Sequence, residues 1–587
     1  MEEYKVRKRK IKICAIVMTI MMISISIVAC GTSNTITESV VIETESENET
    51  TTTKTQDTTT SDFTYTSEDI DVGYDEASAT KIVLDGDSIR VDGDGATAKD
   101  NIVTISKGGT YVLSGTLSDG QIIVSADKQD TIRIVLNGVE MNCSTSSAIY
   151  CEQSKKVILI LAEGTINTIS DATTYVYEST DETEPDAAIF SKDDLILTGT
   201  GTLNLTANYN NGIQSKDNLL LASGTYNVTA INNGLHGKDS LTILDGTYTI
   251  DAKHNAIHSK GNLTIDEGTY SLKAVKKGLH ADQLVTVNGG SIDVSECFEG
   301  MEGVSITING GDINIVASDD GLNVANQDET DTTTTEITQE QRPQAGNQLA
   351  QAEGEMPQVN GEMPQGDSQI PRGGGGQMGD GMDVVDEDCI ITINGGKITI
   401  DASGDGIDSN GHVYMTGGEV YVNGPTSNGD GALDYNGDFI ISGGTLVAIG
   451  SSGMAQTISD ASTQNGLEVI YTQSQKAGSI VSLLDSDEKE IISYTSVKDY
   501  SSIVISTSAL KAGETYTLTY NGTALGQITL SDISTVVDET GAQATVNTMR
   551  GGGPRERGGQ MPQGQGDMPQ DMQPPNQTQS GETTTTN

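Results

Sequence analysis

The sequence contains no tryptophan and little positive charge, with 33 lysines and arginines against 83 aspartates and glutamates in 587 residues. Without tryptophan, a flat aromatic platform for cellulose is not apparent. Phosphate binding needs clustered lysine and arginine, so a net charge of −50 argues against nucleic acid as a partner. An acidic polymer would also be repelled, unless cations bridge it to the protein.

Metal-binding cysteine pairs are also missing. Beyond the N-terminal segment the cysteines are Cys143, Cys151, Cys297 and Cys389, and no two of them have the CxxC spacing. A Cys143–Cys151 disulfide is one interpretation in an oxidising environment. We expect the other, in which all of them are buried free thiols.

The N-terminal segment, 1–30, has the layout of a secretory signal, in which a basic stretch through Lys12 precedes an apolar run from Ile13 to Ala29. The run ends in IVAC and is followed by Gly31. This ending resembles a bacterial lipoprotein signal and implies cleavage before Cys30 and lipidation of its thiol. The alternative is a simple N-terminal anchor helix. In either case we expect the rest of the chain to be extracellular and surface-exposed, held to the cell membrane through the lipid on Cys30 in the first case.

Three segments have little apolar surface to bury. Residues 31–78 are rich in threonine, serine and glutamate, whereas residues 327–388 and 541–587 are rich in glycine, methionine, proline and glutamine. Chains of such composition cannot offset the entropy lost on folding. We therefore expect a disordered linker, a disordered insertion and a disordered tail.

From residue 187 the sequence repeats with a period of 22. Two successive units are "GLHGKDSLTILDGTYTIDAKHN" at 234–255 and "AIHSKGNLTIDEGTYSLKAVKK" at 256–277. Each unit has two short alternating strands split at a glycine, then a third short segment that carries one marker apolar residue. The marker residues are Ile213, Leu235, Ile257, Leu279, Met301 and Leu322. Such a coil cannot bury its own inner face, so coils stack ~4.8 Å apart.

The period therefore predicts an all-β protein with a right-handed, single-stranded parallel β-helix over residues 79–450. After Leu322 the period resumes at Ile407 once residues 327–388 are removed, so the insertion leaves and re-enters within one coil. Residues 451–540 lose the period, and their short strands are expected to form a small C-terminal β cap over the open end.

A β-helix converts the period into columns of neighbouring side chains. The position after the marker, which we call the histidine–acid column, reads Phe190, Gln214, His236, His258, His280, Glu302, Asn323, Asp408 and Asp434. The position two before the marker, the asparagine–acid column, reads Asn211, Asn233, Asn255, Lys277, Glu299, Asp320 and Asp405, with Asp430 shifted by one residue. Both columns change to carboxylate toward the C-terminal coils.

The acidic end of these columns is the candidate functional site. The residues expected to converge there are Glu299, Glu302, Asp319, Asp320, Asn323, Asp405, Asp408, Asp430 and Asp434. Carboxylates at this spacing repel one another unless they are protonated or neutralised. Hard oxygen ligands on flexible glycine-rich turns are what Ca²⁺ takes, and no EF-hand spacing is present. We expect one or more calcium sites, and the alternative is a solvated acidic ridge of turn residues.

Two other columns have both a structural and a functional interpretation. The histidine column is His236, His258 and His280, and the tyrosine column is Tyr226, Tyr248 and Tyr270. The histidines could bind a transition metal, but a plain ladder of stacked side chains is the interpretation we favour. Each tyrosine alternates with an aliphatic residue on the same face, so we expect the tyrosines in the core.

Catalysis needs more than an acidic edge. Pectate lyases, which are β-helices with calcium-bearing edges, use a strong base, usually arginine, to take the α-proton of a uronate. Between residues 187 and 450 the arginines are Arg342 and Arg372, both in the insertion, and Lys277 is expected to pair with Glu299. A hydrolase would use paired carboxylates around a water, but nothing in the sequence fixes their separation. We favour a non-catalytic, calcium-assisted binder over a calcium-dependent lyase or hydrolase, and over a structural stalk or adhesin.

Five stretches together resemble a known family. They are "GGTYVLSGTLSDGQIIV" at 108–124, "VLNGVEM" at 135–141, "SDDGLN" at 318–323, "GDGIDSNG" at 404–411 and "GGEVYVNGP" at 417–425. In this order they resemble bacterial cell-surface carbohydrate-binding domain-containing proteins with a pectate-lyase-like β-helix, over about residues 80–540. The resemblance implies a lipid-anchored or secreted protein that binds calcium and plant cell-wall polysaccharides, including acidic ones, without demonstrated catalysis. It marks the aspartates and asparagines of the SDDGLN and GDGIDSNG turns as calcium ligands, and the long insertion departs from it.

Overall fold

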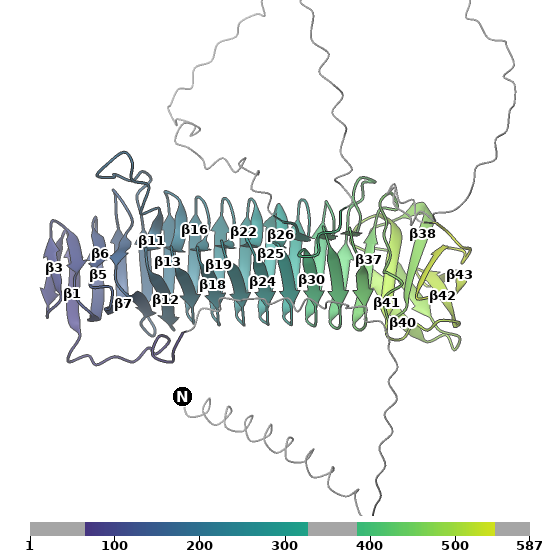
Figure 1. Ribbon diagram of the computed structural model, residues 1–587, viewed down its shortest axis with the longest axis horizontal. Coiled ribbons are helices and arrows are strands. Elements are labelled where there is room, and N and C mark those ends of the chain that lie inside the picture. The colour runs from purple at the N-terminus through teal and green to yellow at the C-terminus, as the bar shows by residue number, and fades with distance from the viewer. Residues whose placement is uncertain (1–64, 327–383, 546–587) are drawn as a thin grey trace, which may run out of the picture. The chain divides into compact units, whose positions relative to one another are not determined.

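The chain divides into two units, residues 1–60 and 61–587. The computed structural model describes residues 65–326 and 384–545, all within the second unit (Figure 1). In this part of the chain the regular elements are all β-strands, and no helix is long and apolar enough to cross a membrane. The expected lipoprotein signal with Cys30, most of the expected insertion and most of the expected tail lie outside the described residues.

One coil of the β-helix consists of three strands, and the next coil repeats them one period later. Strands β18 (Ser240–Ile243), β19 (Thr247–Ala252) and β20 (Ile257–Ser259) pair in parallel with β21 (Asn262–Ile265), β22 (Thr269–Ala274) and β23 (Lys277–Ala281). The marker residue Ile257 is in register with the marker residue Leu279. The parallel β-helix that the period predicts is therefore confirmed.

The coils form three ladders of strands along one stack (Figure 1). The first ladder contains β9 (Lys156–Leu161), β12 (Asp194–Gly199), β15 (Asn218–Leu221), β18, β21, β24 (Leu284–Val287), β27 (Ser305–Ile308), β30 (Ile390–Ile393), β33 (His412–Met415) and β36 (Phe439–Ile441). The second contains β10 (Ile166–Ser170), β13 (Thr202–Ala207), β16 (Thr225–Ala230), β19, β22, β25 (Ser291–Cys297), β28 (Asp312–Ala317), β31 (Lys397–Ala402), β34 (Glu419–Asn423) and β37 (Thr445–Gly450). The third contains β3 (Ala96–Lys99), β4 (Ile102–Ile105), β6 (Gln121–Ser125), β8 (Ile149–Gln153), β11 (Ala187–Ser191), β14 (Asn211–Ser215), β17 (Leu235–Gly237), β20, β23, β26 (Glu299–Gly303), β29 (Leu322–Val324), β32 (Ile407–Ser409) and β35 (Leu433–Tyr435).

A glycine makes the corner between the first and second strands of a coil. Gly246 has φ +138°, and a Cβ there would lie 3.0 Å from the carbonyl oxygen of Gly224 in the preceding coil. The corner therefore demands glycine both for its backbone angle and for the close stacking of coils. Two residues later Tyr248 points inward, and its hydroxyl donates to the Asp245 carbonyl at 2.9 Å.

The tyrosine column lies in the core, as predicted. The ring of Tyr248 stacks on Tyr226 and Tyr270 with centroid distances of 5.1 and 4.9 Å, and all three side chains are buried. The expected thiols are there too, because Cys143, Cys151, Cys297 and Cys389 are free and buried.

The insertion lies between the third strand of one coil and the first strand of the next. Strand β29 ends at Val324 and β30 begins at Ile390, yet both strands keep the register of their ladders. Residues 384–388, expected to belong to the disordered insertion, instead form a turn in which Asp386 N–H donates to the Asn410 carbonyl at 2.9 Å. The polar composition of this segment hides the turn, because hydrogen bonds of the Asp386 backbone and carboxylate hold it rather than apolar burial.

Residues 65–78 correct the expectation of a linker that reaches residue 78. Tyr65 and Ile70 pack on an apolar patch on the outer face of the early coils, and the buried Asp69 carboxylate pairs with Lys156 at 2.6 Å. The patch consists of Val112, Val135, Ile158, Ile160, Ile196 and Leu220. Because those side chains point out of the coils, they need a cover, and residues 65–78 supply it.

Antiparallel strands close both ends of the stack. At the N-terminal end, β1 (Thr80–Gly86) pairs with β2 (Ser88–Asp92), and β3 pairs with β4. Strand β1 also pairs in parallel with the long strand β5 (Gly109–Leu117), and β5 pairs in parallel with β7 (Thr131–Asn142), which leads into the regular coils.

The cap at the C-terminal end consists of β38 (Gly466–Gln475), β39 (Ile480–Leu484), β40 (Glu490–Thr495), β41 (Tyr500–Thr507), β42 (Thr515–Tyr520), β43 (Thr523–Thr529) and β44 (Ser534–Asp538). Its strand β41 pairs antiparallel with β37. The small β cap covers the last coil in this way, as the sequence predicts.

Candidate functional site

The histidine–acid column has the register that the sequence predicts. Along the third ladder the residues in register are His236, His258, His280, Glu302, Asn323, Asp408 and Asp434. Successive members are one coil apart, ~4.8 Å. The change from imidazole to carboxylate therefore takes place in a single step, between His280 and Glu302.

The asparagine–acid column has a structural role that the sequence alone does not disclose. Asn211 Oδ1 accepts a hydrogen bond from Asn233 N–H in the next coil at 3.1 Å. Asp320 Oδ1 accepts from Asp405 N–H at 2.7 Å, and Asp405 Oδ1 accepts from Gly431 N–H at 2.6 Å. In the acidic coils an aspartate thus makes the bond that an asparagine makes elsewhere.

Three of the predicted ligands come together. Glu299, Asp319 and Asp320, which we call the carboxylate triad, each offer a carboxylate oxygen, and these oxygens lie within 4.8 Å of one another. All three side chains are half-buried. The Glu299 Oε2 atom is buried without a hydrogen-bond partner among the described residues and lies 3.8 Å from the Lys277 ammonium. This donor set has the hard oxygen chemistry that a calcium ion takes.

The triad resists ionisation. Burial raises the pKa of Asp320 to about 7, and the nearby charges of Asp319, Asp405 and Glu299 add to the effect. Burial likewise raises the pKa of Asp405 to about 7, with Asp434, Asp408 and Asp430 contributing. The pKa values of Glu299 and Asp319 are also raised, again mainly by burial. A cation would relieve this cost, since it favours the charged form of each carboxyl group.

Glu302 is separated from the triad by its own partners. Its carboxylate makes a close ion pair with Lys277 and lies 3.5 Å from His280 Nε2. Lys277 is also 3.8 Å from Glu299, so the expected pairing of Lys277 with Glu299 is found, together with a closer one to Glu302. Sequence reasoning missed that closer pair.

The remaining predicted residues follow the triad along the stack. Asp434 accepts a hydrogen bond from Gln456 Nε2 at 2.7 Å, and Asp430 accepts one from the Ser427 hydroxyl at 3.2 Å. Asp408 lies in register between Asn323 and Asp434. These carboxylates surround Asp405 closely enough to raise its pKa, and they extend the acidic edge beyond the triad.

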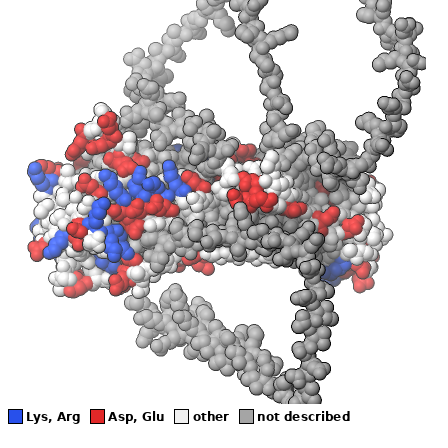
Figure 2. All heavy atoms as spheres, in the orientation of Figure 1, with Lys and Arg blue, Asp and Glu red and all other residues white. Residues whose placement is uncertain are grey.

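A column of lysines was missed in the sequence, although the same period reveals it. The residues three after the marker are Lys192, Lys216, Lys238 and Lys260. In each coil the lysine N–H donates to a carbonyl of the preceding coil, as Lys216 does to Ser191. Figure 2 shows lysine and arginine side chains gathered over the N-terminal coils on the face drawn. Acidic side chains lie among these cations on the same face, and Lys277 lies at the acidic end beside Glu299.

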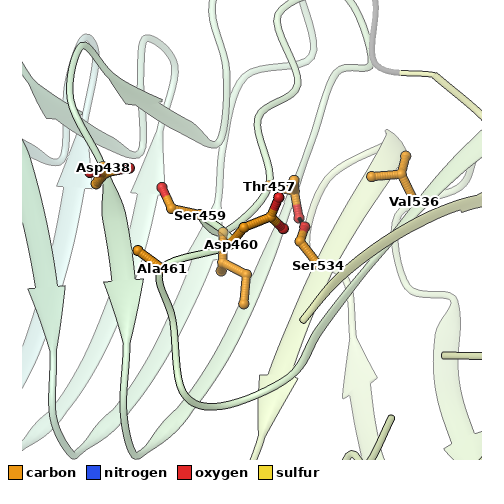
Figure 3. Close-up of a pocket in the computed structure, with 8 residues that line it drawn as sticks. Asp438, Thr457, Ser459, Asp460, Ala461, Ser534 and Val536 are labelled. Carbon is orange, nitrogen blue, oxygen red and sulfur yellow. Dashed lines mark hydrogen bonds between the residues drawn. The ribbon is translucent and has the colours of Figure 1, made fainter. Parts of the chain in front are cut away.

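A recess of about 530 Å³ lies elsewhere, where the last coil meets the cap (Figure 3). Asp438, Ser459 and Asp460 line it, and the Thr457 and Ser534 hydroxyls make a 3.1 Å hydrogen bond at its other side. None of the predicted ligands lines this recess. The clustered ionisable groups, rather than the recess, therefore define the candidate site.

The fold and the site define a class: a parallel β-helix whose outer columns present ladders of ionisable side chains. Two overlapping matches, at residues 99–345 and 253–431, fit the model of the carbohydrate-binding domain-containing protein family. Together they span more than half of the chain, which therefore belongs to this family.

Two relatives illustrate the likeness. A carbohydrate-binding domain-containing protein of Acetivibrio thermocellus is 38% identical over 151 residues, which are 26% of this chain and 53% of that protein. The chain thus spans about half the length of this curated relative. A solved structure described as a polysaccharide lyase-like protein from C. thermocellum, a gadolinium derivative, has 32% sequence identity and a TM-score of 0.36, and the match covers 42% of this chain and 98% of that one.

Proposed function

We propose that the chain binds polysaccharide at the bacterial cell surface without catalysing a reaction, and that Ca²⁺ at the acidic end of the columns assists this binding. The glycans we expect are plant cell-wall polysaccharides, acidic ones in particular. Family membership supports the polysaccharide. The observation that carries the calcium is the carboxylate triad, whose three carboxylate oxygens lie within 4.8 Å of one another.

The triad fits a bridging ion better than a closed structural one. Ca²⁺ takes six to eight oxygen ligands, and the triad supplies three carboxylates on a half-buried edge. The remaining positions would be open to water, to further acids of the edge, or to hydroxyl and carboxylate oxygens of a sugar. With a net charge of −50 on the chain, such an ion would also remove the repulsion of an acidic glycan.

The surroundings of the triad favour binding over catalysis. A lyase needs a base beside the ion to take a proton from the sugar. The nearest cation is Lys277, which is engaged by Glu302 and Glu299, and residues 187–326 and 384–450 contain no arginine. Lyase or hydrolase activity therefore remains the second candidate function, with the paired carboxylates as its only support.

The proposal includes a place in the cell. Lipidation of Cys30 would hold the chain at the outer face of the membrane, with the β-helix displayed to the medium. The support for this is the signal-like N-terminal sequence, in which an apolar run ends in IVAC before Gly31.

Co-sedimentation of the full chain with insoluble cellulose, and gel retardation in polygalacturonate, would test the proposal. We expect retention in Ca²⁺, loss in a chelator, and no absorbance from an unsaturated product. The double variant Glu299→Gln and Asp319→Asn should lose retention, whereas Asp251→Asn, an exposed partner of Lys253, should not. If the chelator and the double variant both leave retention unchanged, the proposed role of calcium is contradicted. If the chain is retained by neither glycan, the proposed polysaccharide binding is contradicted.

A further inference from the structure

The histidines of this chain are concentrated in one place. The sequence has five, and four of them lie in three consecutive coils: His236, His254, His258 and His280. The fifth, His412, is on β33. Because the four lie next to the acidic end of the histidine–acid column, their clustering calls for a chemical explanation of its own.

Two of these imidazoles point the same edge toward one carboxylate. The rings of His258 and His280 are parallel, 6° apart in plane, with centroids separated by 4.4 Å. His258 Nε2 lies 2.9 Å from Asp282 Oδ1, and His280 Nε2 lies 3.7 Å from the same oxygen. The stacking of coils thus sets two nitrogens and one oxygen around a common point, and these ligand atoms lie within 4.8 Å of one another.

These separations suit a transition-metal ion. Zinc binds imidazole nitrogen and carboxylate oxygen at about 2.0–2.2 Å in tetrahedral geometry, which places ligand atoms roughly 3.3 Å apart. The observed 2.9 and 3.7 Å bracket that spacing. We infer that His258, His280 and Asp282 bind a divalent transition-metal ion of the zinc type. The inference is independent of the proposed polysaccharide binding and of the calcium ion.

The column position of Asp282 argues for a site rather than a plain ladder. The equivalent residue in the four preceding coils is a lysine: Lys192, Lys216, Lys238 and Lys260. A carboxylate replaces the lysine in the coil of His280. A ladder of stacked rings does not need that exchange, but a cation between the two imidazoles does.

Burial gives the two histidines the character of ligands. The rings of His258 and His280 are almost entirely enclosed, whereas the Asp282 side chain is 31% exposed. The surrounding protein thus fixes the two imidazoles, and the partly exposed Asp282 side chain marks the side from which an ion would enter.

The neighbouring carboxylate is already used. Glu302 lies 3.5 Å from His280 Nε2 but makes a close ion pair with Lys277. The protein therefore supplies three ligands, and a fourth position stays open to water or to an added oxygen ligand, as in zinc sites with three protein ligands. Imidazole ligands also distinguish this site from the all-oxygen triad, where Ca²⁺ is expected.

Titration of the full chain with Zn²⁺ by calorimetry, in excess Ca²⁺, tests the inference. We expect one Zn²⁺ ion per chain that Ca²⁺ does not displace. Co²⁺ in its place should give visible absorption without the intense near-ultraviolet band of thiolate ligands, which separates this site from the buried cysteines. Even the loss of a group that only supports a metal ligand costs about 10- to 100-fold in affinity, so His280→Gln and His258→Gln should each weaken binding by more than about 100-fold.

Two further variants keep the test decisive. Asp282→Asn leaves both stacked rings in place, so it should fold normally and still weaken Zn²⁺ binding. His412→Gln, which removes a histidine on β33, several coils away from His258 and His280, should bind Zn²⁺ as the unchanged chain does. Absence of Zn²⁺ binding overturns the inference, as does binding that survives Asp282→Asn and His280→Gln or that His412→Gln abolishes.

Discussion

Replacing Asp320 by asparagine separates the charge of the carboxylate triad from its role in the fold. Asp320 Oδ1 accepts a hydrogen bond from Asp405 N–H at 2.7 Å. In the earlier coils, Asn211 and Asn233 make the same bond, because the side-chain oxygen of each accepts from the backbone N–H of the next coil. Asparagine at position 320 should therefore keep the backbone bond between coils and remove only the charge.

The size of the effect follows from the pKa of Asp320. Burial and the neighbouring carboxylates raise it from 3.8 to about 7, and about three pKa units correspond to at most about 4 kcal/mol. Solvent screening of a half-buried group reduces this to on the order of 1–2 kcal/mol. The folded state binds the proton more tightly than the unfolded state, so the free energy of unfolding falls as pH rises from about 4 to 7 and is level above that.

Thermal unfolding without calcium, at pH 5 and at pH 8, measures this effect. We expect Asp320→Asn to melt roughly 2–4 °C higher than the unchanged chain at pH 8 and by less than half that margin at pH 5, because only about a third of the loss has occurred there. The reverse change, Asn233→Asp, introduces a carboxylate into the asparagine coils and should lower the melting temperature at pH 8. Equal melting of Asp320→Asn and the unchanged chain at pH 8, or lower melting of the variant, would refute the reasoning.

Three other predictions concern the core and the ion pairs. Tyr248→Phe should lower the free energy of unfolding, measured in urea, by about 1 kcal/mol, because the hydrogen bond to the Asp245 carbonyl is lost. Tyr248→Ala, which also removes the stacked ring, should lower it by about 3–5 kcal/mol. Equal losses would argue against the stacked ring as the main contribution. Burial raises the pKa of Glu468 on β38 to about 8, so the free energy of unfolding should fall between about pH 5 and pH 8. Glu468→Leu should therefore melt higher than the unchanged chain at pH 9. The same dependence of melting temperature on pH in both proteins would contradict the raised pKa of Glu468. Lys277→Met removes the cation beside Glu302 and Glu299 and should lower the free energy of unfolding by about 3 kcal/mol at pH 8. Recovery of this stability when Glu302→Gln is added would identify the ion pair as the cause. An unchanged free energy of unfolding in Lys277→Met would show that the ion pair contributes nothing.

The strict period of the sequence explains why so much of the fold could be predicted. Stacked coils require the same residue type at equivalent positions, so marker residues such as Ile257 and Leu279 reveal the register directly. For the same reason, the bounds of the insertion could be inferred from the spacing of the marker residues Leu322 and Ile407. Residues 65–78 were misjudged because their composition is polar, and the apolar patch that they cover belongs to coils that come much later in the chain, from Val112 to Leu220.

The candidate site was predictable only as a set of columns. Register placed Glu299, Glu302 and Asp320 at one end of the stack, but not which of them meet. The long side chain of Lys277 pairs most closely with Glu302, and this pairing depends on side-chain rotamers rather than on sequence spacing. The lysine column was equally periodic and could have been found by reading one more position of each unit.

Calcium titration of the full chain by calorimetry, with and without polygalacturonate, tests the central claim most directly. The account predicts heat from Ca²⁺ binding that Glu299→Gln and Asp319→Asn remove, and stronger binding of the ion when polygalacturonate is present. Two carboxyl groups with pKa values of about 7 should also make this binding weaken as pH falls from 8 to 5.5, by about 30-fold for each proton that the ion displaces. No calcium heat at pH 8 would contradict the account and leave the acidic end of the columns as a solvated ridge.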